Sequence, residues 1–169
     1  MITANLDEKS SAKIELWLEF SDFLYEEARF MDDSLYDDWF ELWAPDCLYW
    51  VPCNSDDVDP AVGISIIYEN HEKIEERILR LKSKFALAQS PQSRLIRSVS
   101  NIRITEASTA GISGSSRFVI GEVRYDRQTA WFGRAEYELV RLEGALKIAK
   151  KKVFLLNNNI PTGNMSFLI

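Results

Sequence analysis

The sequence predicts an α+β fold in which N-terminal helices pack on one face of a long, strongly bent, mainly antiparallel sheet. Apolar side chains recur with helical spacing over residues 10–43 and again over 71–85. From residue 94 onward the period changes to the two-residue alternation of strands. Because the helices precede most of the strands, the two kinds of element are segregated, and the bent sheet forms a cone with an apolar interior. The length of 169 residues suits a single domain over 1–169, in which residues 1–12 form a flexible N-terminus.

Three helices are expected, each from an amphipathic pattern. The first begins at Ser10 or Ser11, either of which can cap it. Its apolar face comprises Ile14, Trp17, Leu18, Ser21, Leu24, Tyr25 and Ala28. The segment 32–34 ends this helix and can cap a second one, which stops before Pro45. The aromatic stripe of the second helix comprises Tyr36, Trp39, Phe40 and Trp43. The third helix, over 71–85, buries Ile74, Ile78, Leu81 and Phe85.

Two short strands and four long ones make up the predicted sheet. The short strands span 47–51 and 64–68, on either side of a polar loop over 53–63. The long strands span 94–107, 112–125, 129–142 and 145–157, and their short joins predict antiparallel hairpins. Such runs exceed the usual ~3–10 residues of a strand, which favours bending.

The alternation within the long strands predicts which side chains face the interior. It is regular for inward Phe118 and Ile120, and it slips near residues 98–101, where a β-bulge is expected. In the last strand Leu146 and Ile148 are expected inside. The basic run 147–152, Lys151 included, is interpreted as a solvated strand edge that could also pair with an acidic partner.

The composition disfavours several classes of function. There are 20 basic and 26 acidic residues, a net charge of −6, whereas nucleic-acid binders usually carry a basic excess. No apolar run approaches the roughly 18 residues of a membrane span, and residues 1–8 lack the pattern of a signal peptide. A single histidine, His71, and two cysteines, Cys47 and Cys53, cannot supply a zinc or mononuclear iron site. We therefore expect a cytoplasmic protein without a metal of its own.

Acid–base chemistry inside the cone would need a buried carboxyl group, with a tyrosine or histidine as hydrogen-bond donor. The candidates are Asp32, Asp33, Asp37, Asp38, Tyr49, Tyr68 and His71. Each has a structural alternative: aspartates at the helix junction can be caps, the tyrosines can be half-buried strand residues, and His71 can lie at a surface or interface. We assign no catalytic residue from the pattern.

The order of several short motifs resembles the small, or β, subunit of bacterial Rieske-type aromatic-ring-hydroxylating dioxygenases. The resemblance runs from about residue 14 to the end of the chain. It is carried by Phe23–Arg29 followed by Asp32-Asp33, Tyr36–Trp39, Tyr49–Pro52, Ser90–Arg94 and Val99–Ile102. The Tyr68–Ser83 stretch and the Leu155–Ile169 tail look most like the systems that act on aromatic carboxylates.

This resemblance implies a cystatin-like or NTF2-like cone and a subunit that belongs to an oxidoreductase without being catalytic alone. It implies no cofactor in this chain: the Rieske [2Fe–2S] cluster and the mononuclear iron belong to the partner α subunit. The implied partners are the large α subunit and two further β chains, in an α3β3 complex that meets a reductase or ferredoxin only indirectly. No nucleic-acid or membrane partner is implied.

Possible subunit-interface residues are Arg94, Arg97, Asn101, Trp50 and Phe167. We expect one of the two arginines to be buried in an ion pair or backbone contact. We also expect the apolar tail, residues 165–169, to be ordered against the sheet or a neighbour, with Pro161 and Gly163 turning the chain toward it. Two alternatives stay open: a free-standing dehydratase or isomerase with an Asp/His/Tyr pocket, and a protein-binding module. An open cone would favour the enzyme, and a filled one the structural subunit.

Overall fold

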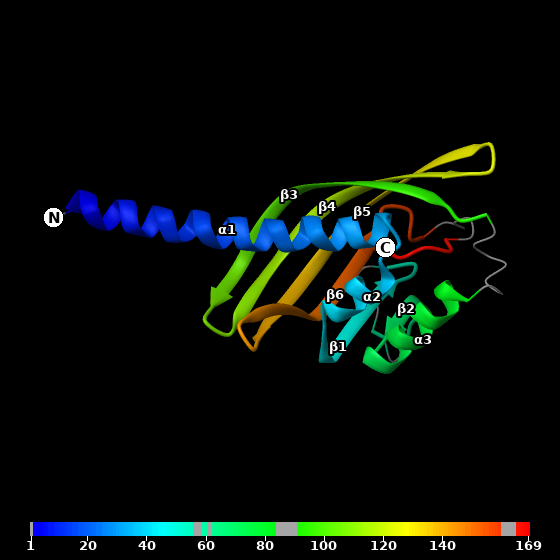
Figure 1. Ribbon diagram of the computed structural model, residues 1–169, viewed down its shortest axis with the longest axis horizontal. Coiled ribbons are helices and arrows are strands. Elements are labelled where there is room, and N and C mark those ends of the chain that lie inside the picture. The colour runs from blue at the N-terminus through cyan, green and yellow to red at the C-terminus, as the bar shows by residue number, and fades with distance from the viewer. Residues whose placement is uncertain (1, 56–58, 61, 84–90, 160–164) are drawn as a thin grey trace.

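In the computed structural model, helices lie against a single sheet (Figure 1). The change from helical to strand periodicity near residue 94 coincides with the start of the four long strands. The structure describes residues 2–55, 59–60, 62–83, 91–159 and 165–169, with side chains from Ser10 onward. Its helices are α1 (Ile2–Asp32), α2 (Tyr36–Glu41) and α3 (His71–Lys82). Its strands are β1 (Trp43–Pro52), β2 (Ser65–Glu69), β3 (Arg94–Ser108), β4 (Gly111–Arg124), β5 (Arg127–Leu142) and β6 (Ala145–Leu155). The predicted α+β class is confirmed.

The six strands form one sheet in the order β2-β1-β6-β5-β4-β3. Every neighbouring pair is antiparallel except β1 and β6, which run parallel, so the mainly antiparallel sheet is confirmed. Helix α1 crosses one face of the sheet, here called the inner face, and continues beyond its edge (Figure 1). Helices α2 and α3 lie at the end formed by β1 and β2 (Figure 1). The long hairpins thus build a sheet that has one covered face.

Helix α1 buries only part of the predicted apolar face: Ser21, Leu24 and Ala28 lie inside, as expected. The helix already begins at Ile2, so the expected cap at Ser10 or Ser11 is wrong, and the flexibility of residues 1–12 stays a prediction. The buried positions are Phe20, Ser21, Leu24, Glu27, Ala28 and Met31. Several residues of the predicted apolar face are exposed: Ile14 (59%), Trp17 (43%), Leu18 (47%) and Tyr25 (48%). The sheet contacts a neighbouring stripe of α1, and that stripe includes a carboxylate.

The second helix is shorter than predicted. It ends at Glu41, and Trp43 and Pro45 belong to β1. A register shift between Trp43 and Leu48 in the β1–β6 pair accommodates the proline, which cannot donate to a ladder. Trp43 still packs in the expected aromatic group, its ring 5.2 Å from that of Trp39 and 5.3 Å from that of Tyr49. The third helix also ends earlier than the predicted residue 85, at Lys82, because Ser83 has an extended backbone; the predicted burial of Phe85 lies outside the described residues.

Two irregularities in the ladders decide which side chains face inward. In β3 the register shifts between Ser100 and Arg103, and Asn101 has φ 52°, so the predicted bulge is confirmed. In β6, Ile148 pairs with Leu139 whereas Lys150 pairs with Glu138, which leaves Ala149 as an extra residue. This bulge reverses the alternation and turns Lys151 into the interior, where the residue is 2% exposed. The interpretation of Lys151 as part of a solvated edge is therefore wrong, because β6 is a central strand.

The backbone at Asn101 yields a stability prediction. Asn101→Gly should leave the free energy of unfolding nearly unchanged, whereas Asn101→Val should lower it by about 1–2 kcal/mol, because a β-branched residue disfavours the left-handed region. Denaturant unfolding measures both values. Ser98→Val, at an exposed position of the same strand before the bulge, is the control and should cost little. Equal stabilities for the glycine and valine variants would contradict the assignment.

Candidate functional site

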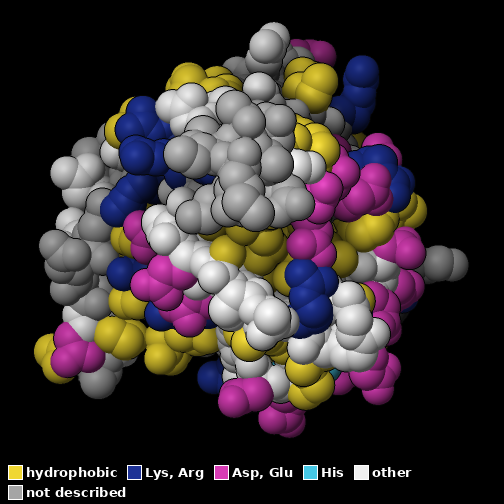
Figure 2. Space-filling view, turned by 90° about the vertical axis from the view of Figure 1, so that its left-hand side faces the viewer, with side chains coloured by type: hydrophobic (Ala, Val, Ile, Leu, Met, Phe, Trp, Pro, Cys, Tyr) yellow, Lys and Arg dark blue, Asp and Glu magenta, His cyan; other side chains and the backbone are white. Residues whose placement is uncertain are grey.

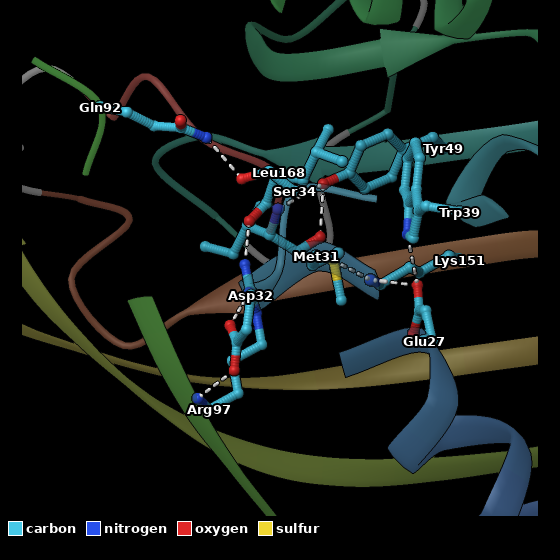
Figure 3. Close-up of polar contacts among 11 residues, drawn as sticks. Glu27, Met31, Asp32, Ser34, Trp39, Tyr49, Gln92, Arg97, Lys151 and Leu168 are labelled. Atoms are coloured by element: carbon cyan, nitrogen blue, oxygen red, sulfur yellow. Dashed lines mark hydrogen bonds and ion pairs between the residues drawn. The ribbon is translucent and has the colours of Figure 1, made fainter. Parts of the chain in front are cut away.

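A buried ion pair lies between α1 and the sheet. The Nζ of Lys151 donates to Oε1 of Glu27 over 2.7 Å, and the two side chains are 2% and 1% exposed. Two further donors reach the same carboxylate: the Trp39 indole at 3.3 Å (Figure 3) and the Tyr137 hydroxyl at 2.8 Å. A buried charge is tolerated only when it is paired and hydrogen-bonded. The cluster meets that condition with residues from α1, α2, β5 and β6.

Burial shifts the pKa of the lysine and of the tyrosine in this cluster. Desolvation lowers the pKa of Lys151, and the neighbouring Glu27 carboxylate opposes the shift. Desolvation raises the pKa of Tyr137, and the charge of Glu27 and its hydrogen bond raise it further. The Tyr137 phenol therefore stays protonated and donates to the carboxylate. The acceptor oxygens of Glu27 are engaged by groups of the protein itself, an arrangement suited to structure and not to proton transfer with a substrate.

A second ion pair joins the end of α1 to β3. The backbone N–H of Arg97 donates to Oδ2 of Asp32 over 2.6 Å, and its guanidinium donates to Oδ1 and to the carbonyl of Leu168. The Arg97 side chain is 3% exposed, and desolvation lowers its pKa against the pull of Asp32. The expectation of a buried arginine is confirmed for Arg97. Asp32, predicted as a cap or an acid, caps nothing: Leu35 precedes α2 without a side-chain cap.

The C-terminal tail closes the interior. The Tyr49 hydroxyl donates to the backbone oxygen of Ile169 and accepts from its N–H over 3.2 Å. Phe167 packs edge-on against Trp131 with ring centroids 5.8 Å apart. Residues 167–169 are 5%, 1% and 2% exposed in turn, so the predicted ordering of the tail against the sheet is confirmed. The roles predicted for Pro161 and Gly163 lie outside the described residues.

Among the residues that the structure describes, little space is left inside the cone. The interior cavity measures about 20 Å³ and is lined by the Glu27 cluster, Arg97 and Ile169 among others. That volume holds about one water molecule, whereas ligand pockets usually measure about 300–1,000 Å³. The pocket required by a free-standing dehydratase or isomerase is therefore filled by side chains and by the tail.

The other acid–base candidates lie apart from this cluster, each with its own surroundings. Asp33 and Asp38 are exposed, and Asp37 pairs with Lys82 at 2.7 Å. Tyr68 is 46% exposed and packs edge-on against Trp50, and the His71 ring lies 4.6 Å from that of Phe40. Of the predicted set, Tyr49 bonds the tail directly, and Asp32 is linked to the tail through Arg97.

Metal-ligating side chains do not gather in the described part of the chain, where no three His, Cys, Asp or Glu residues form a group suited to an ion. Burial raises the pKa of the Cys47 thiol to about 11, which disfavours the thiolate that metals bind. None of the described helices is long and apolar enough to cross a membrane.

The predicted interface residues fall into two groups. Arg94 and Asn101 are exposed. Trp50 is 8% exposed, and its indole N–H donates to the Ser65 hydroxyl over 3.0 Å. The Lys152 ammonium lies 3.9 Å from the centre of the Trp50 ring. Arg97 and Phe167 are buried by contacts within the chain. A role for any of them between subunits stays a prediction.

A larger hollow lies on the outer face of the sheet, the face opposite α1. It measures about 570 Å³ and is here called the outer groove. Its lining comprises Ser100, Arg117, Phe118, Val119, Phe132, Gly133, Arg134, Phe154, Leu155, Leu156 and Asn158. Strand alternation points Arg117 and Val119 away from the interior that Phe118 and Ile120 fill. The outer groove is thus an apolar surface with cationic side chains.

Sequence reasoning missed Glu27, Lys151, Tyr137 and Glu122, which hold the interior together. One signal was available: Glu27 follows Phe20 by seven positions and precedes Met31 by four, which places it on the same helix face. Glu122 accepts from the Trp131 indole at 3.0 Å and from the Ser93 hydroxyl at 2.6 Å. Nothing local marks Lys151, since its position depends on the bulge at Ala149.

Fold and site together define a cone-shaped α+β protein with an interior closed by its own residues, and comparison with known proteins agrees. The family described as "Ring hydroxylating beta subunit" matches residues 26–162, so the chain belongs to the β subunits of aromatic-ring-hydroxylating dioxygenases. The small oxygenase component of the p-cumate 2,3-dioxygenase system of Pseudomonas putida is 34% identical over 89% of this chain and 86% of its own. The β subunit of benzoate 1,2-dioxygenase of Acinetobacter baylyi is 32% identical over 84% and 87%.

Solved structures place the fold in the same group. The β subunit of benzoate 1,2-dioxygenase from Burkholderia mallei superposes with a TM-score of 0.72 at 28% identity, covering 85% of this chain and 92% of that one. A chain of naphthalene 1,2-dioxygenase gives 0.77 at 17% identity over 88% and 83%, which shows the fold alone. The NTF2-like cone and the β-subunit identification are confirmed, in preference to a free-standing dehydratase or isomerase.

The buried pair predicts an asymmetric response to mutation. Glu27→Leu should lower the free energy of unfolding by about 3–5 kcal/mol, because it leaves the Lys151 charge buried without its counterion. The double variant Glu27→Leu/Lys151→Met should recover at least half of that loss. Guanidinium unfolding measures both, with exposed Glu26→Leu as the control. A double variant as unstable as the single one would contradict the pairing.

The tail predicts a loss of thermal stability on truncation. Deleting residues 165–169 removes three buried apolar side chains worth about 1.5–3 kcal/mol each, against an ordering cost of about 1–2 kcal/mol per residue. It also leaves Arg97 and Tyr49 without their tail acceptors. We expect the melting temperature to fall by about 5–10 °C in calorimetry. An unchanged temperature would show that the tail contributes nothing.

The buried tyrosines predict a fall in stability at high pH. Burial raises the pKa of Tyr49 and Tyr137 above their ordinary value, so between that value and the folded pKa only the unfolded chain loses the protons. Stability is therefore lost as pH rises above about 10, by up to about 1.4 kcal/mol per pH unit for each tyrosine. Lys151 has a lowered pKa, so its contribution makes stability rise with pH. That contribution applies only below the ordinary lysine pKa of 10.5, which lies under the pH range tested. Tyr137→Phe should lessen the slope measured by denaturant unfolding between pH 10.5 and 11.5, and an identical slope would contradict the assignment.

Proposed function

We propose that this chain is the structural β subunit of an α3β3 dioxygenase, in which three β chains support three catalytic α subunits. The partner α subunit would hold the Rieske [2Fe–2S] cluster and the mononuclear iron, and a reductase or ferredoxin would deliver electrons to α and not to β. The assembly would act in the cytoplasm. Family membership supports an α partner, and the stoichiometry is part of the proposal.

The filled interior is the observation that carries this proposal. A cavity of about 20 Å³ leaves no room for a ring substrate, while an outer groove of about 570 Å³ stays open. Apolar side chains exposed on a single chain are typical of subunits made to be covered by partners. The surfaces of this chain, and not its interior, therefore carry its function.

The relatives support an aromatic carboxylate as substrate of the complex. Five of them, at 29–34% identity, are named for p-cumate, 2-halobenzoate, benzoate, toluate and anthranilate, all of which are ring carboxylates. Relatives named for the uncharged rings biphenyl and benzene are 24–26% identical. Recognition of the carboxylate would fall to the α subunit, since the interior of this chain is closed.

Co-expression with a dioxygenase α subunit from the same organism tests the assembly. We expect a complex with equal numbers of both chains and a mass of six subunits in light scattering, and we expect α without β to be unstable or inactive. The purified complex should oxidise benzoate in preference to benzene. An α subunit that is stable and fully active alone, or a β chain that never co-purifies with it, would contradict the proposal.

A further inference from the structure

Helix α1 carries an exposed apolar stripe that the fold does not cover. Ile14, Trp17 and Leu18 stand at positions i, i+3 and i+4, and they are 59%, 43% and 47% exposed; Tyr25 extends the stripe at 48%. This part of α1 lies toward the end that projects beyond the sheet (Figure 1). Figure 2, which faces that end, shows hydrophobic side chains exposed beside acidic ones. Spacing of this kind is how an amphipathic helix presents anchors to a groove.

An acidic row runs alongside the stripe. It comprises Glu15, Glu19, Asp22 and Glu26, spaced at i, i+4, i+7 and i+11, so that all four project from one side of α1. Glu19 and Glu26 already pair with Arg141 and Arg29. Glu15 and Asp22 are exposed. The uncovered surface of α1 thus presents an apolar stripe alongside a negative row.

The outer groove has the complementary chemistry. Arg117 and Arg134 are directly opposite each other on β4 and β5, where like charges repel, and the Arg134 guanidinium also lies 3.8 Å from the Glu136 carboxylate of its own chain. Arg117 is exposed, and the Arg134 guanidinium lies 3.6 Å from the centre of the Phe154 ring. Beside them Val119 and Phe132 are 40% and 47% exposed. The groove therefore offers an apolar floor beside a pair of positive charges.

We propose that the outer groove binds the exposed stripe of α1 from a second copy of this chain. Trp17, with Ile14 and Leu18, would enter the groove beside Phe132, and the acidic row would face Arg117 and Arg134. The two surfaces lie on opposite faces of the sheet and cannot meet within one chain. The contact is consequently head-to-tail, the kind that closes into a ring when the rotation between copies permits. This inference rests on the proposed β trimer and names its contact.

Two single variants, one on each surface, test the contact in the full-length chain. Trp17→Ala removes the central anchor, and Arg117→Glu reverses a charge of the groove; both positions are solvent-exposed, and circular dichroism verifies folding. Sedimentation equilibrium should show self-association weakened by about 30-fold or more for each, as for a hot-spot residue. The matched controls Leu79→Ala on α3 and Arg127→Glu at the start of β5 change exposed residues outside both surfaces, and they should stay within about threefold of wild type.

Mixing the two variants gives the sharper result. The Trp17→Ala chain keeps an intact groove and the Arg117→Glu chain keeps an intact helix, so one good contact can form between them. We expect a two-chain species that neither variant forms alone. Variants that trimerise like wild type, or a mixture without recovery, would overturn this contact and leave the trimer standing. If the variants still form trimers but no longer bind the α subunit, the groove belongs to the α interface, and the proposed β–β contact is likewise overturned. A monomeric wild-type chain would contradict the trimer itself.

Discussion

The enclosed pair of Glu27 and Lys151 determines how the helical and sheet halves of this protein meet. It joins residues 124 positions apart, from α1 to the central strand β6. Such a pair is costly to desolvate and gains little over an apolar contact unless its remaining hydrogen bonds are made. Tyr137 and Trp39 make them. A shift of α1 along the sheet would leave a charge unpaired, so the pair fixes the helix position more strictly than apolar contacts would.

The tail completes the enclosure from the other side. Arg97 donates both to Asp32 at the end of α1 and to the carbonyl of Leu168 (Figure 3). Tyr49 donates to the backbone oxygen of Ile169. The polar groups that an enzyme of this fold could direct at a ligand are here directed at the protein's own backbone. The fold alone does not determine function. In this chain the interior is filled by side chains and by the tail, which distinguishes it from an enzyme of the same fold. What remains for partners is the outer surface, consistent with membership of the dioxygenase β subunits.

The sequence predicts the elements of this fold better than the composition of its interior. The four long strands and their hairpins follow from alternation and short joins, which are local signals, and the bulge at Asn101 was visible as a slip in that alternation. The orientation of Lys151 was not predictable, because a single extra residue, Ala149, reverses the strand. The buried face of α1 is predicted only in part, because apolar residues extend around more of the helix than the sheet covers, and only the tertiary contact decides which of them are buried.

Native-state hydrogen exchange of the tail tests most directly whether the interior is permanently closed. If the tail is part of the core, the amide of Ile169, which donates to the Tyr49 hydroxyl, should exchange only with the opening that releases β5 and β6. The free energy of opening measured at the Ile169 amide should then equal that of the β5 and β6 amides, and both should fall with denaturant at the same rate. An Ile169 amide that exchanges at the rate of an unstructured chain, while β5 and β6 stay protected, would show that the tail leaves the cone and would contradict the closed interior.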